Sequence, residues 1–265
     1  MSQYLNFNPN QTALITGASS GIGYAAAVRL AEAGCHQLVL LARRADRLLN
    51  LKLYLESQYK NINVEIITAD LGQPDHLKEK LKEKLEEKFL NRKIDILINN
   101  AGLALTSDPI QTGVLSNWDR MIEINLKAVL FLTQWVLNHS MLGQNSGHII
   151  NLGSVAGRDN YPGGNVYCMT KHALRSFSQN LRLDLLGKNI RVTEVAPGAV
   201  HTEFSEVRWG DKEKSDAFYR TFTPLKAEDV AEAIFYALAC PQHVNISELV
   251  IYPTDQASVN YIYKK

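Results

Sequence analysis

The chain has 265 residues, of which 46% are hydrophobic, and its formal net charge is +1 at pH 7. This length and apolar content suffice for one large domain with its own core. Because positive and negative charges nearly cancel, we expect no binding to nucleic acid or to an anionic membrane.

Cysteine and histidine usage excludes two further classes. The three cysteines, Cys35, Cys168 and Cys240, are widely spaced, which argues against a disulfide framework. Neither they nor the seven histidines have the spacing of metal ligands, so we expect no metal site. The N-terminus lacks the apolar core of a signal peptide, and the longest apolar run, near 128–137, is too short to span a bilayer. We therefore expect a cytoplasmic protein.

Strand-like and helix-like patterns alternate along the chain. Short apolar strands are expected at 12–16, 38–41, 64–68, 94–98, 148–152, 190–195 and 248–252. Helices are expected at about 24–33, 45–59, 74–89, 116–138 and 228–239, with a further one that has Asn165 as its N-cap and reaches Leu185. This alternation predicts a single α/β domain, 1–265: a Rossmann-type, doubly wound parallel sheet of about seven strands with helices on both faces.

Only a polar segment, about 197–226, interrupts the alternation, and we expect it to shape a substrate pocket. In doubly wound sheets, ligands bind at the carboxyl ends of the strands. The sequence places five candidate site residues at such ends: Gly17, Asp70, Asn99, Ser154 and Pro197. We expect them to meet at one edge of the sheet.

A glycine-rich loop follows the first predicted strand. Gly17, Gly21 and Gly23 let the backbone approach a pyrophosphate, whose charge meets the free N–H groups of the next helix. Their spacing, Gly-x-x-x-Gly-x-Gly, differs from the dinucleotide fingerprint Gly-x-Gly-x-x-Gly, so a tight turn without a ligand is the alternative. The strand before and the helix after favour a nucleotide site.

Two arginines, Arg43 and Arg44, follow the second predicted strand. An NAD site usually offers an acidic residue here for the ribose 2′-hydroxyl, whereas arginine favours a 2′-phosphate. The alternative is a pair of solvated surface arginines. We predict NADP rather than NAD.

Tyr167 and Lys171 are four residues apart on a predicted helix, so their side chains lie on one face. An ammonium group beside a phenol favours the phenolate and is expected to lower its pKa from about 10. Ser154 ends a predicted strand and can add a hydroxyl group. A tuned phenol beside a hydroxyl can protonate a carbonyl oxygen or deprotonate an alcohol. Tyr-x-x-x-Lys alone is not specific, since many helices carry it by chance.

Two amide-bearing segments remain open to two readings. Asn99, Asn100, Ala101 and Gly102 suit a wall pressed against a ribose, but the same residue types also favour a turn. Asn125 lies on an otherwise apolar helix face, where a buried amide must be hydrogen-bonded. It either holds a bound water or braces the backbone.

These features occur in one order: Thr16-Gly17-Ala18-Ser19-Ser20-Gly21-Ile22-Gly23, Asn99-Asn100-Ala101-Gly102, Asn125, Ser154, Tyr167 with Lys171, and Pro197-Gly198 through Thr202. Together they resemble the short-chain dehydrogenase/reductase family over nearly the whole chain. The joint pattern is specific to that family, although no single part of it is.

The resemblance implies an NADP(H)-dependent enzyme that transfers hydride between the nicotinamide and an alcohol or carbonyl carbon. Tyr167 is then the general acid/base, Ser154 binds the substrate oxygen, and Lys171 binds the nicotinamide ribose. Asn125 supports a proton relay, Asp70 meets the adenine, and the backbone near Val200 meets the carboxamide. The cofactor residues implied are Gly17, Ser19, Ser20, Gly21, Ile22, Gly23, Arg43, Arg44, Asp70, Leu71, Asn99, Ala101, Gly102, Tyr167, Lys171, Pro197, Gly198, Val200 and Thr202.

Segments 153–167, 201–208, 223–225 and 253–258 resemble more narrowly the NADP-dependent 3-hydroxy acid (serine) dehydrogenase branch. That branch implies small β-hydroxy acid substrates, such as serine or 3-hydroxypropionate and malonic semialdehyde, and a homotetramer. A carboxylate substrate favours a guanidinium partner, for which Arg208 and Arg158 are the candidates. Either can instead be a surface or subunit-contact arginine.

Subunit contacts are expected on the helix face formed by Phe177, Leu181 and Leu185, and at Tyr261 and Tyr263 near the C-terminus.

Two alternatives stay open. The same machinery serves a 3-oxoacyl thioester reductase or a broad carbonyl reductase for bulkier ketones. From another class, the chain is an NADP-binding regulator without catalysis, although a regulator needs no proton relay.

Overall fold

The computed structural model describes residues 6–87 and 93–265. Among these, seven parallel strands form one sheet in the order β3-β2-β1-β4-β5-β6-β7. The strands are β1 (Thr12–Thr16), β2 (Gln37–Ala42), β3 (Asn63–Thr68), β4 (Ile96–Asn99), β5 (Gly147–Leu152), β6 (Ile190–Pro197) and β7 (Glu248–Ile251). This confirms the predicted doubly wound fold.

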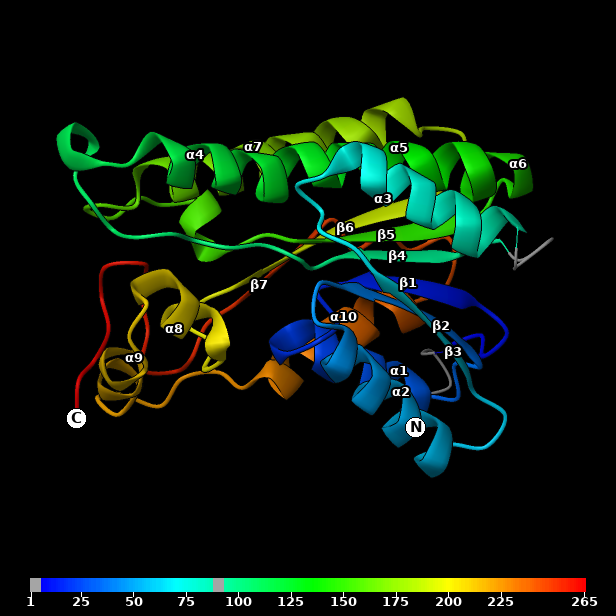
Figure 1. Ribbon diagram of the computed structural model, residues 1–265, viewed down its shortest axis with the longest axis horizontal. Helices are drawn as coiled ribbons and strands as arrows, with labels where there is room; N and C mark the ends of the chain where they lie inside the picture. The colour runs from blue at the N-terminus through cyan, green and yellow to red at the C-terminus, as the bar shows by residue number, and fades with distance from the viewer. Residues whose placement is uncertain (1–5, 88–92) are drawn as a thin grey trace.

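Helices cover both faces of the sheet (Figure 1). On one face lie α1 (Gly21–Glu32), α2 (Ala45–Gln58) and α10 (Ala227–Ala239). On the other lie α3 (Pro74–Leu81), α4 (Leu115–Ile122), α5 (Ala128–Val136), α6 (Leu142–Gln144) and α7 (Asn165–Asp184). The shorter α8 (Glu203–Trp209) and α9 (Lys212–Tyr219) lie beside the carboxyl ends of the strands.

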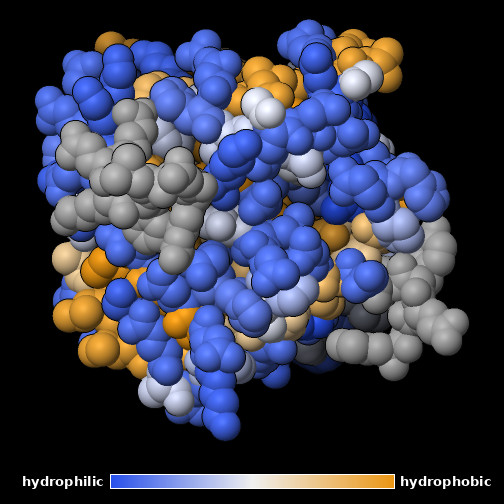
Figure 2. All heavy atoms as spheres, turned by 90° about the vertical axis from the view of Figure 1, so that its right-hand side faces the viewer, coloured by the Kyte–Doolittle hydropathy of each residue, from blue (hydrophilic) through white to orange (hydrophobic). Residues whose placement is uncertain are grey.

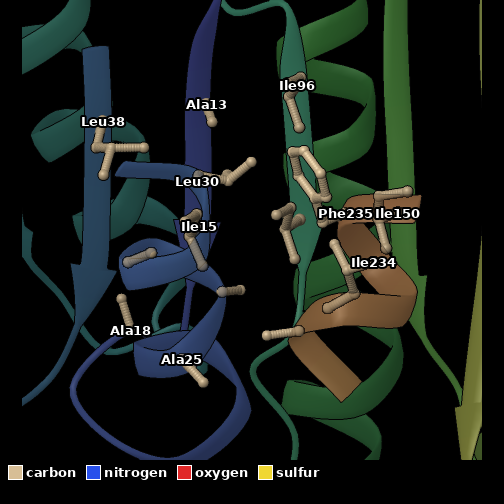
Figure 3. Packing of buried hydrophobic residues seen from close by; sticks show 14 of the residues in the cluster. Ala13, Ile15, Ala18, Ala25, Leu30, Leu38, Ile96, Ile150, Ile234 and Phe235 are labelled. Carbon is tan, nitrogen blue, oxygen red and sulfur yellow. The ribbon is translucent and has the colours of Figure 1, made fainter. Parts of the chain in front are cut away.

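Two hydrophobic cores follow from this layering, because successive side chains of a strand point to opposite faces. In β1, Ala13 and Ile15 pack toward α1 and α10, whereas Leu14 packs toward the α3, α5 and α7 side. Figure 3 shows Ala13 and Ile15 in the first core with Leu30 and Phe235. Burial on both faces explains why these strands are continuous apolar runs rather than alternating ones.

Helix boundaries differ from expectation in three places. The helix predicted at 116–138 is α4, α5 and α6 joined by two π-helical turns, Glu123–Lys127 and Leu137–Met141. Asn165 is the first residue of α7 and not its N-cap; its side-chain amide donates to the Asp108 carbonyl, 2.9 Å away. α3 continues as a π-helical turn, Lys82–Glu87, and the end predicted at 89 lies outside the described residues.

Figure 2 shows the face that holds the amino ends of the strands, and the residues visible there are mostly hydrophilic. The candidate site lies at the opposite edge, where the strands end. In the described part of the chain, no helix combines the length and the apolar character needed to cross a membrane.

Candidate active site

Three polar side chains meet where β5 ends and α7 begins. Ser154 follows β5, and its Oγ accepts a hydrogen bond from the Ala156 N–H at 3.1 Å. Tyr167 and Lys171 lie on successive turns of α7, and the Lys171 Nζ is 5.9 Å from the centre of the Tyr167 ring. Ser154 hydrogen-bonds the Tyr167 hydroxyl group, which favours the phenolate. The sequence therefore predicted correctly that these three residues share one location.

The ionisation of Tyr167 differs from the prediction. Burial raises its pKa to about 12, although the bond from Ser154 and the charge of Arg208 both act to lower it. Lys171 does not offset the burial, because its Nζ donates to the Leu152 carbonyl at 2.7 Å instead of to the phenol. The predicted lowering of the Tyr167 pKa is therefore wrong.

Lys171 itself is strongly affected by burial, which lowers its pKa from 10.5 to about 8, against an opposing effect of the buried Glu194 carboxylate. In the unfolded chain the amine regains its ordinary pKa and binds its proton more tightly. Protonated Lys171 therefore destabilises the fold below pH 8, and this penalty disappears as the pH rises from about 8 to 10.5.

We expect Lys171→Met to remove this pH dependence. Relative to the variant, the wild-type protein should gain about 2 kcal/mol of unfolding free energy between pH 7 and pH 10, measured by urea denaturation. The comparison stops at pH 10 because ionisation of Tyr167 acts in the opposite direction above that pH. Lys60→Met, at an exposed position, is the control. Parallel stability curves for wild type and Lys171→Met would contradict the assignment.

Asn125 lies in the first π-helical turn and is 1% exposed. Its Oδ1 accepts from the Leu103 N–H at 2.9 Å, and its Nδ2 donates to the Leu103 carbonyl at 2.8 Å and to Thr170 Oγ1 at 3.1 Å. Of the two readings of this amide, its contacts favour the one in which it braces the backbone. It holds the loop after β4 against α7, next to Gly102, where an added Cβ would lie 3.5 Å from the Lys171 Nζ.

The glycine loop has the geometry of a phosphate cradle. Gly17 and Gly21 have φ angles of +68° and +56°, which side chains rarely adopt. A Cβ at Gly17 would lie 2.8 Å from the Asn100 Nδ2, and one at Gly23 would lie 2.6 Å from the Gly17 carbonyl oxygen. Within the described residues, α1 receives no side-chain cap at Ser20, so its first N–H groups are available to an anion.

Arg44 lies directly beside this loop. Its guanidinium donates to Ser19 Oγ at 3.2 Å, to Ser20 Oγ at 2.6 Å and to a Glu203 carboxylate oxygen at 2.8 Å. Arg43 is exposed at the end of β2. Sequence reasoning missed Arg47, one helical turn after Arg44, whose guanidinium also binds Glu203.

Other predicted cofactor residues have contacts of their own. The Asp70 carboxylate accepts from Arg120 Nη2 at 2.6 and 2.7 Å. Burial acts to raise the pKa of Asp70, but the Gly72 N–H and Arg120 outweigh it and hold the pKa below its usual value. The Leu71 side chain is part of the second core, which leaves only its backbone for a ligand.

The side chain of Asn99 points away from the glycine loop. Its Nδ2 donates to Thr133 Oγ1 at 3.1 Å and to Asn151 Oδ1 at 2.9 Å, so its side chain lies between the sheet and the α5 and α7 layer. Asn100 contacts the glycine loop instead, since its Nδ2 donates to the Thr16 carbonyl at 2.8 Å. Of the two amides at the end of β4, only that of Asn100 therefore lies on the side of the glycine loop.

The chain beyond β6 reaches back to the glycine loop. Thr202 Oγ1 caps α8 by accepting from the Phe204 N–H at 3.3 Å, and a Cβ at Gly21 would lie 3.3 Å from the Thr202 Cγ2. Before it, the Gly198 N–H donates to the Ile251 carbonyl, and the Val200 carbonyl accepts from the Tyr219 hydroxyl at 2.7 Å. Pro197, Gly198, Val200 and Thr202 thus line the expected edge of the sheet.

The two candidate arginines differ. Arg158 forms bonds of 2.9 Å with the buried Glu194 and 2.8 Å with Glu248, which favours the structural alternative for this residue. Arg208, on α8, instead lies near Tyr167, and its charge acts to lower the pKa of that tyrosine. It donates to Ser107 Oγ from Nε at 3.0 Å and from Nη2 at 2.5 Å.

Tyr161 is a further site residue that the sequence did not single out. Its ring lies 5.0 Å from the Arg208 guanidinium carbon, and its hydroxyl is buried and close enough to Arg208 for the guanidinium to act on its ionisation. A hydroxyl beside a guanidinium can donate, together with it, to an acceptor group of a ligand. The Tyr161-Pro162-Gly163-Gly164 segment before α7 was the available signal.

Comparison with known proteins agrees with this geometry. Residues 11–213 match the family model described as short chain dehydrogenase. Sulfoacetaldehyde reductase 2 of Chromohalobacter salexigens is 44% identical over 92% of this chain and 94% of its own length. The NADP-dependent 3-hydroxy acid dehydrogenase of Schizosaccharomyces pombe is 40% identical over 96% and 97%. A closed form of serine dehydrogenase complexed with NADP+ superimposes with a TM-score of 0.87 at 40% identity, covering 94% of this chain and 98% of that one. The chain therefore belongs to the short-chain dehydrogenase family, which confirms the resemblance found in its motifs.

Proposed function

We propose that this chain, an NADP(H)-dependent oxidoreductase acting on hydroxyl groups, interconverts a small 3-hydroxy acid and the corresponding carbonyl acid. Serine and 3-hydroxypropionate, with malonic semialdehyde, are the substrates that fit best. The observation that supports an acidic substrate is Arg208, whose guanidinium lies beside the buried hydroxyl of Tyr161 and acts with its charge on Tyr167.

The residues around the glycine loop fit NADP(H). The cradle at Gly17 and Gly21 and the uncapped start of α1 suit the pyrophosphate. Arg43 and Arg44 suit the 2′-phosphate, since guanidinium groups form charge-assisted bonds with it. Bound NADP(H) supplies or accepts the hydride, and the protein supplies the alignment and the proton.

Tyr167 moves the proton on the reacting oxygen in this proposal, and Ser154 hydrogen-bonds the same oxygen. Because burial keeps Tyr167 protonated at neutral pH, it is ready to donate to a carbonyl substrate. Removal of a proton from an alcohol requires the phenolate, which a neighbouring positive charge favours. Lys171 supplies such a charge once its amine faces the ribose and the phenol.

Arg208 selects the substrate class. Its fork-shaped guanidinium can bind two oxygens of an acid group, and the Tyr161 hydroxyl can donate to the same group. A sulfonate has the same charge and one oxygen more. The 44% identity to a sulfoacetaldehyde reductase makes reduction of sulfoacetaldehyde the second candidate.

A substrate panel followed by NADPH absorbance tests the proposal. We expect malonic semialdehyde to give a higher kcat/KM than propanal, which lacks the acid group, and than an acetoacetyl thioester. A preference for sulfoacetaldehyde would select the second candidate, and a preference for the thioester would contradict both. If every hydroxy acid, aldehyde and ketone failed, the alternative of a non-catalytic NADP-binding regulator would be restored.

We propose a homotetramer, but one whose contacts do not use the predicted Leu181 and Leu185 face of α7; Tyr261 and Tyr263 are exposed and remain a candidate contact. Leu181 and Leu185 are buried in the second core, so the predicted face of α7 points to the sheet. Leu183 and Leu186 are exposed instead, at 71% and 84%, and are better candidates for burial between subunits. A monomer mass by light scattering at micromolar concentration would contradict this proposal.

The proposed location is the cytoplasm. Cys35, Cys168 and Cys240 are free thiols in the structure, the state that a reducing compartment maintains. Recovery of the native protein in an extracellular or periplasmic fraction would contradict it.

A further inference from the structure

A single carboxylate joins the two arginines beside the glycine loop. Glu203, the first residue of α8, accepts from Arg44 Nη1 at 2.8 Å, and Arg47 on α2 binds its other oxygen. Arg44 also donates to Ser19 and Ser20, so the carboxylate lies at the edge of the expected cofactor cradle. Ion pairs therefore join segments that are 159 residues apart in sequence.

These contacts are accessible. The side chains of Arg44, Arg47 and Glu203 are 39%, 43% and 38% exposed, so a soluble anion can reach them. Exposed ion pairs stabilise a protein little, because solvent and salt screen them. A surface pocket of about 330 Å³, lined in part by Ser19, Arg47 and Tyr54, opens beside them. The site is therefore a pair of arginines, Arg44 and Arg47, that bind the Glu203 carboxylate of the same chain. The adjacent pocket has space for a larger anion.

The same helix reaches the catalytic tyrosine. Phe204 follows Glu203, and its ring centroid lies 5.7 Å from that of Tyr167. One turn further on, Arg208 binds Ser107 in the loop after β4. A shift of α8 at Glu203 therefore changes the surroundings of both Tyr167 and the proposed acid-binding group.

We propose that Arg47 joins Arg44 in binding the cofactor 2′-phosphate, and that Glu203 occupies this site in the free protein until the phosphate displaces it. The inference rests on the proposed placement of the 2′-phosphate at this end of the cleft. A phosphate offers more charge and more acceptor oxygens than one carboxylate, and the two anions repel each other when side by side. Displacement frees the start of α8, so cofactor binding is coupled to the position of Phe204 and Arg208.

The test uses two soluble fragments, 2′,5′-ADP, which carries the 2′-phosphate, and 5′-AMP, which lacks it. Binding is measured by calorimetry with the full chain. We expect Glu203→Gln to bind 2′,5′-ADP about 5- to 10-fold more tightly than wild type, since it removes the competing charge. Affinity for 5′-AMP should not change. Glu206→Gln, the same charge change one turn along α8, is the matched control and should resemble wild type.

Arg47→Ala should bind 2′,5′-ADP about 10-fold more weakly and 5′-AMP normally, as expected for loss of one charge-assisted bond. Hydrogen exchange of the wild-type chain supplies a readout that needs no variant. The amides of α8 should exchange faster with 2′,5′-ADP bound than with 5′-AMP bound, and should already be fast in Glu203→Gln.

The outcomes separate this inference from the cofactor placement. If the wild-type chain binds both fragments equally, the 2′-phosphate does not lie at these arginines, and both ideas are overturned. If it prefers 2′,5′-ADP but Glu203→Gln binds no more tightly, or binds more weakly, the placement stands and displacement is overturned. Unchanged α8 exchange with 2′,5′-ADP would overturn the coupling.

Discussion

Replacing Tyr167 with phenylalanine is expected to lower kcat by at least about 1,000-fold, because it deletes the hydroxyl that we propose to move the proton. The ring remains and keeps its packing against Phe204, at a centroid distance of 5.7 Å, so the fold and the cofactor site should persist. Turnover is measured by NADPH absorbance and NADPH affinity by fluorescence titration. The affinity should stay within about threefold of wild type, since an uncharged hydroxyl contributes little to it.

Tyr236→Phe provides the matched control for this variant. Tyr236 is 45% exposed on α10, far in the chain from the catalytic segment, and loses the same hydroxyl group. It should retain wild-type turnover. Near-native turnover of Tyr167→Phe would show that another group moves the proton, and a parallel loss of NADPH binding would indicate that the tyrosine serves cofactor binding instead.

The fold could be predicted from sequence because one physical signal repeats. Strands such as β2 and β4 are buried on both faces and appear as short uninterrupted apolar runs, and each is separated from the next by an amphipathic helix. Parallel order then places all strand ends on one edge. This sufficed to predict that Ser154, Tyr167 and Lys171 lie together.

What sequence could not supply was the direction of individual side chains. Asn99 and Asn100 are adjacent and chemically identical, yet only Asn100 faces the glycine loop, because neighbouring side chains at the end of a strand point to opposite faces. The same limit affected α7, where Leu181 and Leu185 face the core and Leu183 faces outward. In each case the residue type is compatible with both orientations, so the type alone does not reveal which way the side chain points.

The sequence also does not show whether burial or a neighbouring charge has the larger effect on the pKa of a side chain. Tyr167 and Lys171 are correctly spaced, but the amine donates to the Leu152 carbonyl, and burial raises the pKa of the phenol. Arg158 and Arg208 are equally basic in sequence, and only the carboxylates packed around Arg158 distinguish them. The polar segment 197–226 gave no periodic pattern long enough to reveal α8 and α9, although α8 carries Arg208.

Replacing Arg208 with lysine should separate acidic from neutral substrates. Lysine keeps the positive charge but loses the planar fork that holds two oxygens at once. We expect kcat/KM for malonic semialdehyde to fall by roughly 10- to 150-fold, the value of one charge-assisted hydrogen bond, whereas propanal should change by less than about threefold. Both rates are measured by NADPH absorbance at saturating cofactor. Arg220→Lys, an exposed arginine after α9, should leave both unchanged.

The comparison between the two substrates decides the role of Arg208, because this side chain also has a structural contact. It donates twice to Ser107 and anchors the loop after β4, so a variant can lose activity simply by loosening that loop. Loosening would affect propanal and malonic semialdehyde alike, since both must reach the same Tyr167. A loss of activity confined to malonic semialdehyde requires a direct contact between Arg208 and the acid group. An equal loss for malonic semialdehyde and propanal would show that Arg208 only holds the pocket in shape.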